Sequence, residues 1–177
     1  TVILFCSDHG ELLGDHHTFR KTRPYQGSIR VPMILYNGGL LGMQDNLVEL
    51  RDVLPTFLEL AGASAPECLD GISMLHPNGR EYLHGEHSGG DIGNQVIVTK
   101  TDKYCWFTES GREQYFDLAG DPGEMHDGIQ DAANQERISV LRGHLIRELA
   151  EREEGYSDGT RLIPGRPQRA VLQRTLR

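Results

Sequence analysis

Short apolar runs in the first 63 positions predict two or three strands and a helix. TVILFC at 1–6 and VPMILY at 31–36 lack polar alternation, which is typical of strands covered on two faces. LVEL at 47–50 is a third strand candidate. Asp52 fits the N-cap of a helix that runs through Leu60 and closes at Gly62. Residues 1–63 are therefore expected to form sheet strands and one helix.

The second half of the chain has a different pattern. Residues 64–80 are rich in Ala, Pro, Gly, Asn and Asp and are interpreted as a linker. Four apolar runs at 81–87, 95–100, 103–110 and 113–118, separated by short turn signals, then predict an antiparallel meander. A helix that packs on this meander is predicted from the spacing of Ile138, Leu141, Leu145 and Leu149. Residues 81–177 are therefore expected to form a C-terminal subdomain.

Charge and composition narrow the classes of partner. The 177 residues carry a formal net charge of −8, which argues against non-specific nucleic-acid binding. No apolar run approaches the roughly 18 residues that span a bilayer, so no membrane span is expected. Three widely spaced cysteines give no disulfide framework, which leaves the cellular location open. The chain begins with Thr1 inside a strand-like run, which suggests a fragment of a longer protein.

Chemistry-bearing side chains are densest in CSDHGELLGDHH at positions 6–17. Asp8 and His9 follow the first predicted strand, and the carboxyl end of a strand is where ligand sites in open sheets gather. The alternative is a loop in which Asp8 caps a helix and His9 is solvated. His16 and His17 have no metal role on spacing alone. Lys21 lies in the same loop, either exposed or folded back toward an anion beside the metal.

Four blocks, in order, resemble one protein family. SDHGELLGDH, K-x3-YQGSIRVP, VLPTFLELAG and KYCWFTESGREQYFDLAGDPGE together resemble the C-terminal portion of a type I sulfatase of the alkaline phosphatase superfamily. The resemblance implies a partial alkaline phosphatase-like α/β sheet followed by a smaller antiparallel sheet with a C-terminal helix. It also implies a sulfuric ester hydrolase that acts on a sulfated small molecule or glycan.

The resemblance assigns roles to individual residues. In the family, the pair after the strand end binds a divalent cation, usually calcium, which implies that Asp8 and His9 are ligands. Because imidazole suits zinc or manganese better than calcium, His9 leaves the metal open. The family's lysine at the start of the K-x3-Y block contacts the sulfate, and this position is Lys21. His87 is a further candidate for a substrate contact.

The family's nucleophile is absent from these residues. Sulfatases use a formylglycine made from Cys or Ser in a C/S-x-P-S-R block, and none of the three cysteines has this context. The chain alone is therefore predicted to be inactive, with formylglycine expected in a preceding part of the complete protein. The unpaired strands of a partial parallel sheet favour homo-oligomerisation or altered packing. The alternatives are a phosphodiester or phosphonate monoester hydrolase of the same superfamily, or a non-catalytic binding or assembly domain.

Three other features invite a functional interpretation. His84 and Glu86 would share one face of a strand and His87 the other, so this cluster is not expected to converge on one metal. Trp106 and Phe107 are interpreted as core residues and not as a sugar platform. The acidic segment FDLAGDPGE is interpreted as a turn in which Glu124 is solvated.

Overall fold

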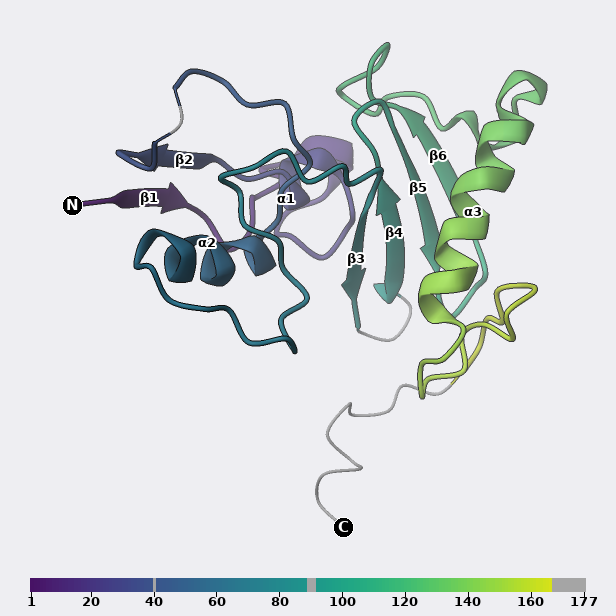
Figure 1. The fold of residues 1–177 in the computed structure, drawn as a ribbon. Helices are drawn as coiled ribbons and strands as arrows, with labels where there is room; N and C mark the ends of the chain where they lie inside the picture. The colour runs from purple at the N-terminus through teal and green to yellow at the C-terminus, as the bar shows by residue number, and fades with distance from the viewer. Residues whose placement is uncertain (40, 89–91, 167–177) are drawn as a thin grey trace.

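The chain forms a two-stranded sheet with a short helix beside it and a four-stranded sheet covered by a longer helix (Figure 1). The computed structural model describes residues 1–39, 41–88 and 92–166. The N-terminal part contains β1 (Ile3–Cys6), η1 (Asp15–His17), α1 (Gln26–Ile29), β2 (Met33–Tyr36), η2 (Leu50–Asp52) and α2 (Val53–Leu60). The C-terminal part contains β3 (Leu83–His87), β4 (Asn94–Val98), β5 (Asp102–Phe107), β6 (Glu113–Asp117), η4 (Gly128–Gln130), η5 (Ala132–Asn134) and α3 (Gln135–Leu149).

The four C-terminal strands form the predicted meander. They pair in sequence order, β3-β4-β5-β6, and every neighbouring pair is antiparallel. Tight turns make this possible: the Thr99 N–H donates to Asp102 O at 2.9 Å, and Gly111, at φ 71°, donates to Phe107 O at 2.8 Å. The meander is confirmed, and short turns of this kind connect β4 to β5 and β5 to β6.

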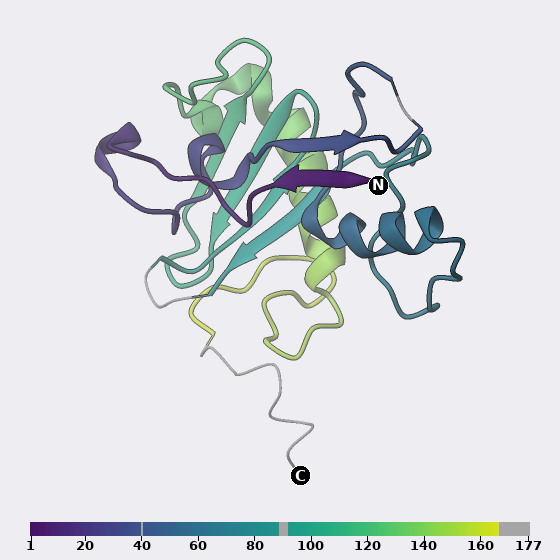
Figure 2. The ribbon, with the colours of Figure 1, turned by 90° about the vertical axis from the view of Figure 1, so that its left-hand side faces the viewer.

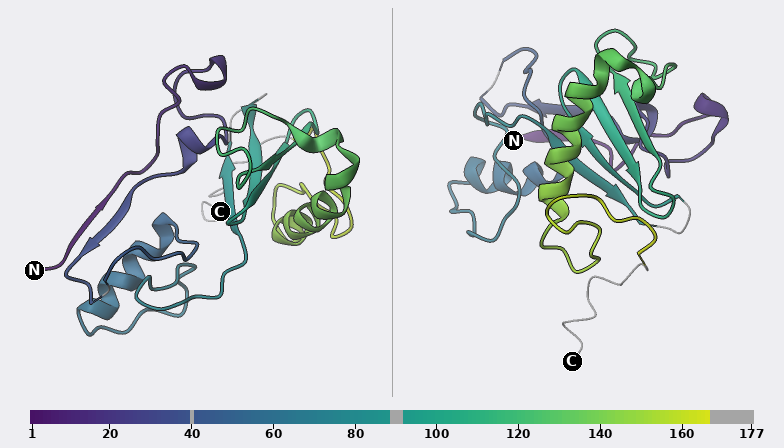
Figure 3. Two further views of the ribbon diagram at one scale, coloured as in Figure 1. Left: turned by 90° about the horizontal axis from the view of Figure 1, so that it is seen from above. Right: turned by 90° about the vertical axis from the view of Figure 1, so that its right-hand side faces the viewer.

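Helix α3 covers one face of the sheet, as Figure 3 shows. The four residues that predicted it have no exposed surface, and they pack against Ile97, Tyr104 and Trp106 of the sheet. Burial of each such side chain contributes roughly 1.5–3 kcal/mol. The predicted helix and its packing are confirmed. No helix in the described ranges has the length and apolarity to cross a membrane.

The opposite face of the sheet packs against the N-terminal part of the chain. Val96, Cys105, Phe107 and Phe116 form this second core, and Tyr25 packs on it with an edge contact to Phe116 at 5.9 Å between ring centroids. The left view of Figure 3 places the sheet between the N-terminal part and α3. Every residue of β5 is therefore buried, which confirms that Trp106 and Phe107 are core residues.

A buried ion pair joins this face to the N-terminal part. Lys103 Nζ pairs with Glu124 and also donates to the backbone oxygen of Pro24. Glu124 Oε2 accepts the backbone N–H of Gln26 at 2.6 Å. The prediction of a solvated Glu124 is wrong, since its side chain is 2% exposed. The physical reason is Lys103, whose completely buried ammonium requires a counter-charge.

Strands β1 and β2 run in opposite directions side by side, as Figure 2 shows. The expectation of parallel strands is wrong for this pair, because the Gly10 N–H donates to Ser28 O and the chain therefore returns at the same end of the strands. Ile3 lies opposite Tyr36 and Phe5 opposite Ile34, so these four side chains share one face. They are 55–66% exposed. The described residues therefore leave this face of β1 and β2 exposed, although the sequence predicted strands covered on both faces. Self-association of the chain stays a prediction.

The chain before α2 is not a strand. Residues 47–49 have no regular structure and η2 begins at Leu50, so the third strand candidate is wrong. The Glu49 N–H donates to Asp52 Oδ2 at 2.9 Å, which turns the backbone into the helix. Helix α2 begins directly after Asp52 and is closed by Gly62 at φ 69°, as the sequence predicts. Asp52 does not cap the helix with its side chain, because its carboxylate binds Glu49, Ile72 and Arg80 instead.

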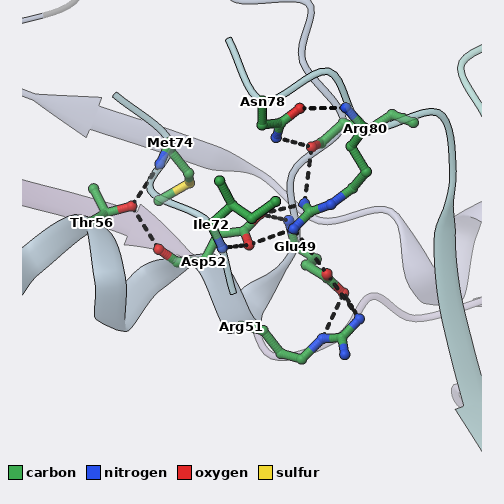
Figure 4. Close-up of polar contacts among 9 residues, drawn as sticks. Glu49, Arg51, Asp52, Thr56, Ile72, Met74, Asn78 and Arg80 are labelled. Carbon is green, nitrogen blue, oxygen red and sulfur yellow. Dashed lines mark hydrogen bonds and ion pairs between the residues drawn. The ribbon is translucent and has the colours of Figure 1, made fainter. Parts of the chain in front are cut away.

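Residues 64–80 are tied to α2 by a buried carboxylate, shown in Figure 4. Asp52 has no exposed surface and accepts two hydrogen bonds from Arg80, at 2.7 and 3.0 Å, and one from the Ile72 N–H at 2.8 Å. Thr56 Oγ1 accepts the Met74 N–H at 2.9 Å. The segment interpreted as a linker thus packs against the helix. The domain boundaries at 63 and 80 stay a prediction.

Candidate metal and anion site

Asp8 and His9 lie in the loop after β1 with their side chains close together. His9 Nδ1 lies 2.7 Å from the carbonyl oxygen of Gly10, so this nitrogen is assigned the proton and donates. The lone pair is then on Nε2, which lies 3.4 Å from Asp8 Oδ2. Two electron-pair donors at this separation fit neighbouring positions on one cation with ligand distances of roughly 2.0–2.6 Å.

These two donors can form part of a metal site. The Asp8 side chain is 81% exposed and the His9 side chain 37%, so both are open to further ligands. Within residues 1–39, 41–88 and 92–166, no three His, Cys, Asp or Glu side chains gather as a metal site. Because a calcium ion takes about six to eight ligands, the others would have to come from water, substrate or further protein groups.

Gly10 fixes the position of this loop. A Cβ atom at Gly10 would lie 2.0 Å from the backbone oxygen of Gly27, so a side chain there would force the two segments apart. The Gly10 N–H donates to Ser28 O at 2.7 Å. The glycine after the Asp-His pair therefore allows close approach to the segment around α1.

Ser28 connects the loop of Asp8 and His9 to the segment that carries Lys21. Its backbone oxygen accepts the Gly10 N–H, and its Oγ donates to the backbone oxygen of Lys21 at 2.6 Å. Ser28 is 2% exposed, whereas Lys21 is exposed. Ser28 thus binds both backbone segments, the one that follows Asp8 and His9 and the one that carries Lys21.

Residues 10–21 fold back on themselves between these anchor points. The Leu12 N–H donates to Arg20 O and the Gly14 N–H to Thr18 O, both at 3.1 Å. Beyond this narrow stem, the His16 ring stacks on Tyr25 with centroids 3.8 Å apart. Because Tyr25 packs on the second core, the stack ties the loop to the C-terminal sheet. Positive φ values occur in this loop at the non-glycine residues Leu13, His16, His17 and Arg20.

His87 lies on the sheet face that packs against the Lys21 segment. In the β3–β4 register it is directly opposite Asn94, and opposed side chains point to the same face. Asn94 is 2% exposed, and its side-chain amide donates to the backbone oxygen of Thr22 at 3.2 Å. The register therefore brings His87 to the face that contacts the residue next to Lys21.

His84 and Glu86 belong to the other face, as strand geometry predicts. His84 Nε2 lies 2.8 Å from Gln95 Oε1, and the Gln95 amide donates to Glu86 at 3.2 Å. Glu86 also pairs with Arg152 at 2.8 Å. Pairing of β3 with β4 is uninterrupted from Leu83 to His87, so no bulge turns His87 toward the other two side chains.

Ser28 and Asn94, which connect the segments of the candidate site, could not be recognised from the sequence. Ser28 lies in the YQGSIRVP block, but its bonds to Gly10 and Lys21 depend on tertiary contacts that no spacing rule gives. The Asn94 bond to Thr22 joins residues 72 positions apart. Asn94 directly precedes the apolar run at 95–100, where an Asn is typical of a turn and gives no sign of a buried partner.

Sequence similarity to known proteins covers most of the chain. Residues 14–152 match the family described as N-sulphoglucosamine sulphohydrolase, C-terminal. The chain is a member of this sulphohydrolase family. The matched region contains Lys21 and His87, whereas Asp8 and His9 precede it. The resemblance to the C-terminal portion of a type I sulfatase is confirmed.

Curated relatives of this sulphohydrolase-family chain are longer proteins. It is 47% identical over 179 residues to an arylsulfatase of Clostridium perfringens, a match that covers 94% of this chain and 37% of the relative. It is 31% identical over 178 residues to the multifunctional alkaline phosphatase superfamily protein PehA of Trinickia caryophylli, covering 86% of this chain and 34% of that protein. The chain thus spans about a third of the length of these relatives.

Solved structures share the fold of this family member. One is a protein in complex with its substrate D-glucosamine-2-N,6-O-disulfate, with a TM-score of 0.74 and 24% identity. The match covers 85% of this chain and 34% of that protein. The fold class predicted from the sequence, a partial alkaline phosphatase-like sheet followed by an antiparallel sheet and helix, is confirmed.

Proposed function

We propose that the complete protein containing this chain is a sulfatase, a sulfuric ester hydrolase that cleaves a sulfated small molecule or glycan. The observation that carries the proposal is the 47% identity to an arylsulfatase across 94% of this chain. The sulphohydrolase family match over residues 14–152 supports the same reaction class.

Asp8 and His9 supply this chain's ligands to a divalent cation in the proposal. Their spacing of 3.4 Å and the lone pair on His9 Nε2 fit this role. Calcium is the cation that the family resemblance implies, with manganese or zinc as the alternatives that imidazole favours. When bound, the cation draws charge from the sulfate oxygens. The hydrogen bond from His9 Nδ1 to Gly10 O would hold the ring in place and leave Nε2 free to bind the cation.

Lys21 and His87 act on the substrate in the proposal. The exposed Lys21 ammonium would bind the sulfate directly, and its charge would offset the negative charge that develops on sulfuryl and bridging oxygens. His87, on the face that packs against this segment, would contact the alcohol part of the ester. The nucleophile, a formylglycine, would come from protein outside these 177 residues, because Cys6, Cys68 and Cys105 all lack the C-x-P-S-R context.

A second candidate function is hydrolysis of phosphodiesters or phosphonate monoesters. The observation in its favour is the 31% identity to a relative named as multifunctional within the alkaline phosphatase superfamily. Phosphoryl and sulfuryl esters place similar tetrahedral anions beside the same cation and lysine. The sulfatase assignment is preferred, because the identity to the arylsulfatase is higher and covers more of the chain.

Kinetics of the full-length protein would test the assignment. Purified enzyme, loaded with calcium, manganese or zinc in turn, would be assayed with 4-nitrophenyl sulfate, 4-nitrophenyl phenylphosphonate and bis-4-nitrophenyl phosphate. We expect the highest kcat/KM with the sulfate. A higher kcat/KM with the phosphonate or the diester would support the second candidate. Turnover of none of the three with any metal would favour a non-catalytic binding or assembly domain.

A further inference from the structure

Two arginine side chains lie close to the ring of one buried phenylalanine at the end of β5. The Arg112 guanidinium carbon lies 4.0 Å from the centroid of Phe107, and that of Arg23 lies 5.9 Å from the same centroid. Phe107 is 1% exposed, so its ring is a fixed platform. Stacking uses the flat face of a guanidinium and leaves its in-plane N–H donors free to bind an anion.

These two arginines lack a carboxylate partner within the described residues. Most cations of the C-terminal part have one: acidic partners are seen for Arg80, Lys100, Lys103, Arg137, Arg142, Arg152 and Arg161. No such ion pair involves Arg23 or Arg112 in residues 1–39, 41–88 and 92–166. On a chain with a net charge of −8, two guanidinium groups without acidic partners at one place are ready to bind an external anion.

The pair of arginines is continuous with the proposed anion site. Phe107 is opposite Asn94 in the β4–β5 register, and Asn94 is opposite His87 in the β3–β4 register. Asn94 also donates to the backbone oxygen of Thr22, which lies between Lys21 and Arg23 in the chain. Residues two apart in an extended chain are at most about 7 Å apart between Cα atoms. One small ligand could therefore meet both Lys21 and Arg23.

We propose that Arg23 and Arg112, held by Phe107, bind a second anionic group of the substrate. The sulfate that is cleaved would lie at Lys21, and a second sulfate or a carboxylate on the same or the neighbouring sugar would accept hydrogen bonds from the two guanidinium groups. The substrate class is then a sugar that carries at least two negative charges. This inference rests on the proposed function, because it takes Lys21 as the position of the reacting sulfate.

Calorimetry with two sugars would test this inference in the full-length protein. D-glucosamine-2-N,6-O-disulfate and D-glucosamine 6-O-sulfate would be titrated into metal-loaded protein prepared without formylglycine, so that the cation stays bound and turnover does not consume the sugars. We expect Arg112→Gln and Arg23→Gln each to weaken disulfate binding by roughly ten- to a hundredfold, the range for a lost charge-assisted hydrogen bond. Binding of the monosulfate should be unchanged in both variants.

Two further variants test whether disulfate binding depends on the planar guanidinium group of Arg112, beyond its charge and beyond correct folding. Arg112→Lys keeps the charge but loses the planar fork, so disulfate affinity should fall between that of the wild type and that of Arg112→Gln. Arg147→Gln, on α3 at the other face of the sheet, is the matched control and should leave both affinities unchanged. Circular dichroism and Tm would exclude variants that fail to fold.

The outcomes separate this inference from the proposed function. The inference would be overturned if the two Gln variants lost affinity equally for both sugars, or lost affinity for neither sugar. This holds even if the enzyme hydrolyses 4-nitrophenyl sulfate. A selective loss of disulfate binding would support it. If the variants show this selectivity but the protein cleaves no sulfate ester, the second-anion site is supported and the sulfatase assignment is contradicted.

Discussion

The ammonium of Lys103 and the carboxylate of Glu124 form an ion pair with 0% and 2% of their side chains exposed. Each partner also binds the N-terminal part, Lys103 at Pro24 O and Glu124 at the Gln26 N–H. The pair therefore joins the meander to the segment between Lys21 and Ser28. Loss of one partner would leave an uncompensated charge in the interior.

Lys103→Met should destabilise the protein by about 3–5 kcal/mol, because Glu124 would remain buried without its counter-charge. Urea unfolding followed by circular dichroism would measure the loss. Lys100→Met is the control, since its pair with Asp45 is exposed and such pairs contribute about 0–1 kcal/mol. Similar losses in the two variants would contradict a special role for the buried pair.

Asp52 should make stability depend on pH in the acid range. Burial raises the pKa of its carboxyl, but hydrogen bonds from Arg80 and from two backbone N–H groups outweigh burial, so the pKa lies below its ordinary value of 3.8. The folded state therefore binds this proton more weakly than the unfolded state. The stabilisation is present at neutral pH and is lost as the pH falls from about 3.8 through the lower folded pKa.

Asp52→Asn should accordingly be less stable than the wild type at neutral pH, and the difference should shrink below about pH 4. Urea midpoints measured between neutral and acid pH would show this. Asp45→Asn, whose carboxylate is 95% exposed, is the control and should follow the wild-type curve. A constant difference between Asp52→Asn and the wild type at all pH values would argue against the assigned shift.

Asp8→Ala should remove metal and activity together in the full-length enzyme. Half of the donor pair that this chain offers would be lost, and removal of a ligand lowers metal affinity strongly. Metal stoichiometry by atomic emission, measured beside kcat, would show the effect. Asp15→Ala, which removes another carboxylate of the same loop, is the control and should keep the metal. If Asp8→Ala binds metal as the wild type does, the assignment of Asp8 as a ligand is wrong.

Lys21→Ala should lower kcat by roughly 10² to 10³ at unchanged metal content, because its charge is used mainly in the transition state. Arg30→Ala removes an exposed cation of the same segment and should change kcat little. Steady-state kinetics with 4-nitrophenyl sulfate would compare the variants. Full activity of Lys21→Ala would mean that Lys21 is a solvated loop residue.

Local patterns predicted the C-terminal part well. The four strands and α3 follow from apolar runs, turn residues and the spacing of Ile138, Leu141, Leu145 and Leu149, all of which act within a few positions of the chain. LVEL failed because Asp52, two residues beyond the run, captures the Glu49 N–H and starts a helix. The apolar composition of the run could not show that the Glu49 N–H would bind the Asp52 side chain instead of a neighbouring strand.

Long-range contacts account for what the sequence could not predict. Glu124 follows a typical turn, and only its pairing with Lys103 across the molecule explains its burial. The ligand and substrate roles of Asp8, His9, Lys21 and His87 stay predictions, although the structure brings their segments together through Ser28 and Asn94. These bonds join residues from 7 to 72 positions apart, and no periodic pattern encodes such pairs.

Residues 22–26 complete the second face of the C-terminal sheet, and this limits how members of this family can be recombined. A chimera that exchanges everything after residue 80 would present Lys103, Glu124 and Asn94 to a foreign segment. Their hydrogen-bond partners in residues 22–26 are backbone atoms, so the path of the main chain through Pro24 must be kept, together with the Tyr25 ring that packs on Phe116. An exchange between two members of the family should therefore carry the short N-terminal segment together with the sheet on which it lies.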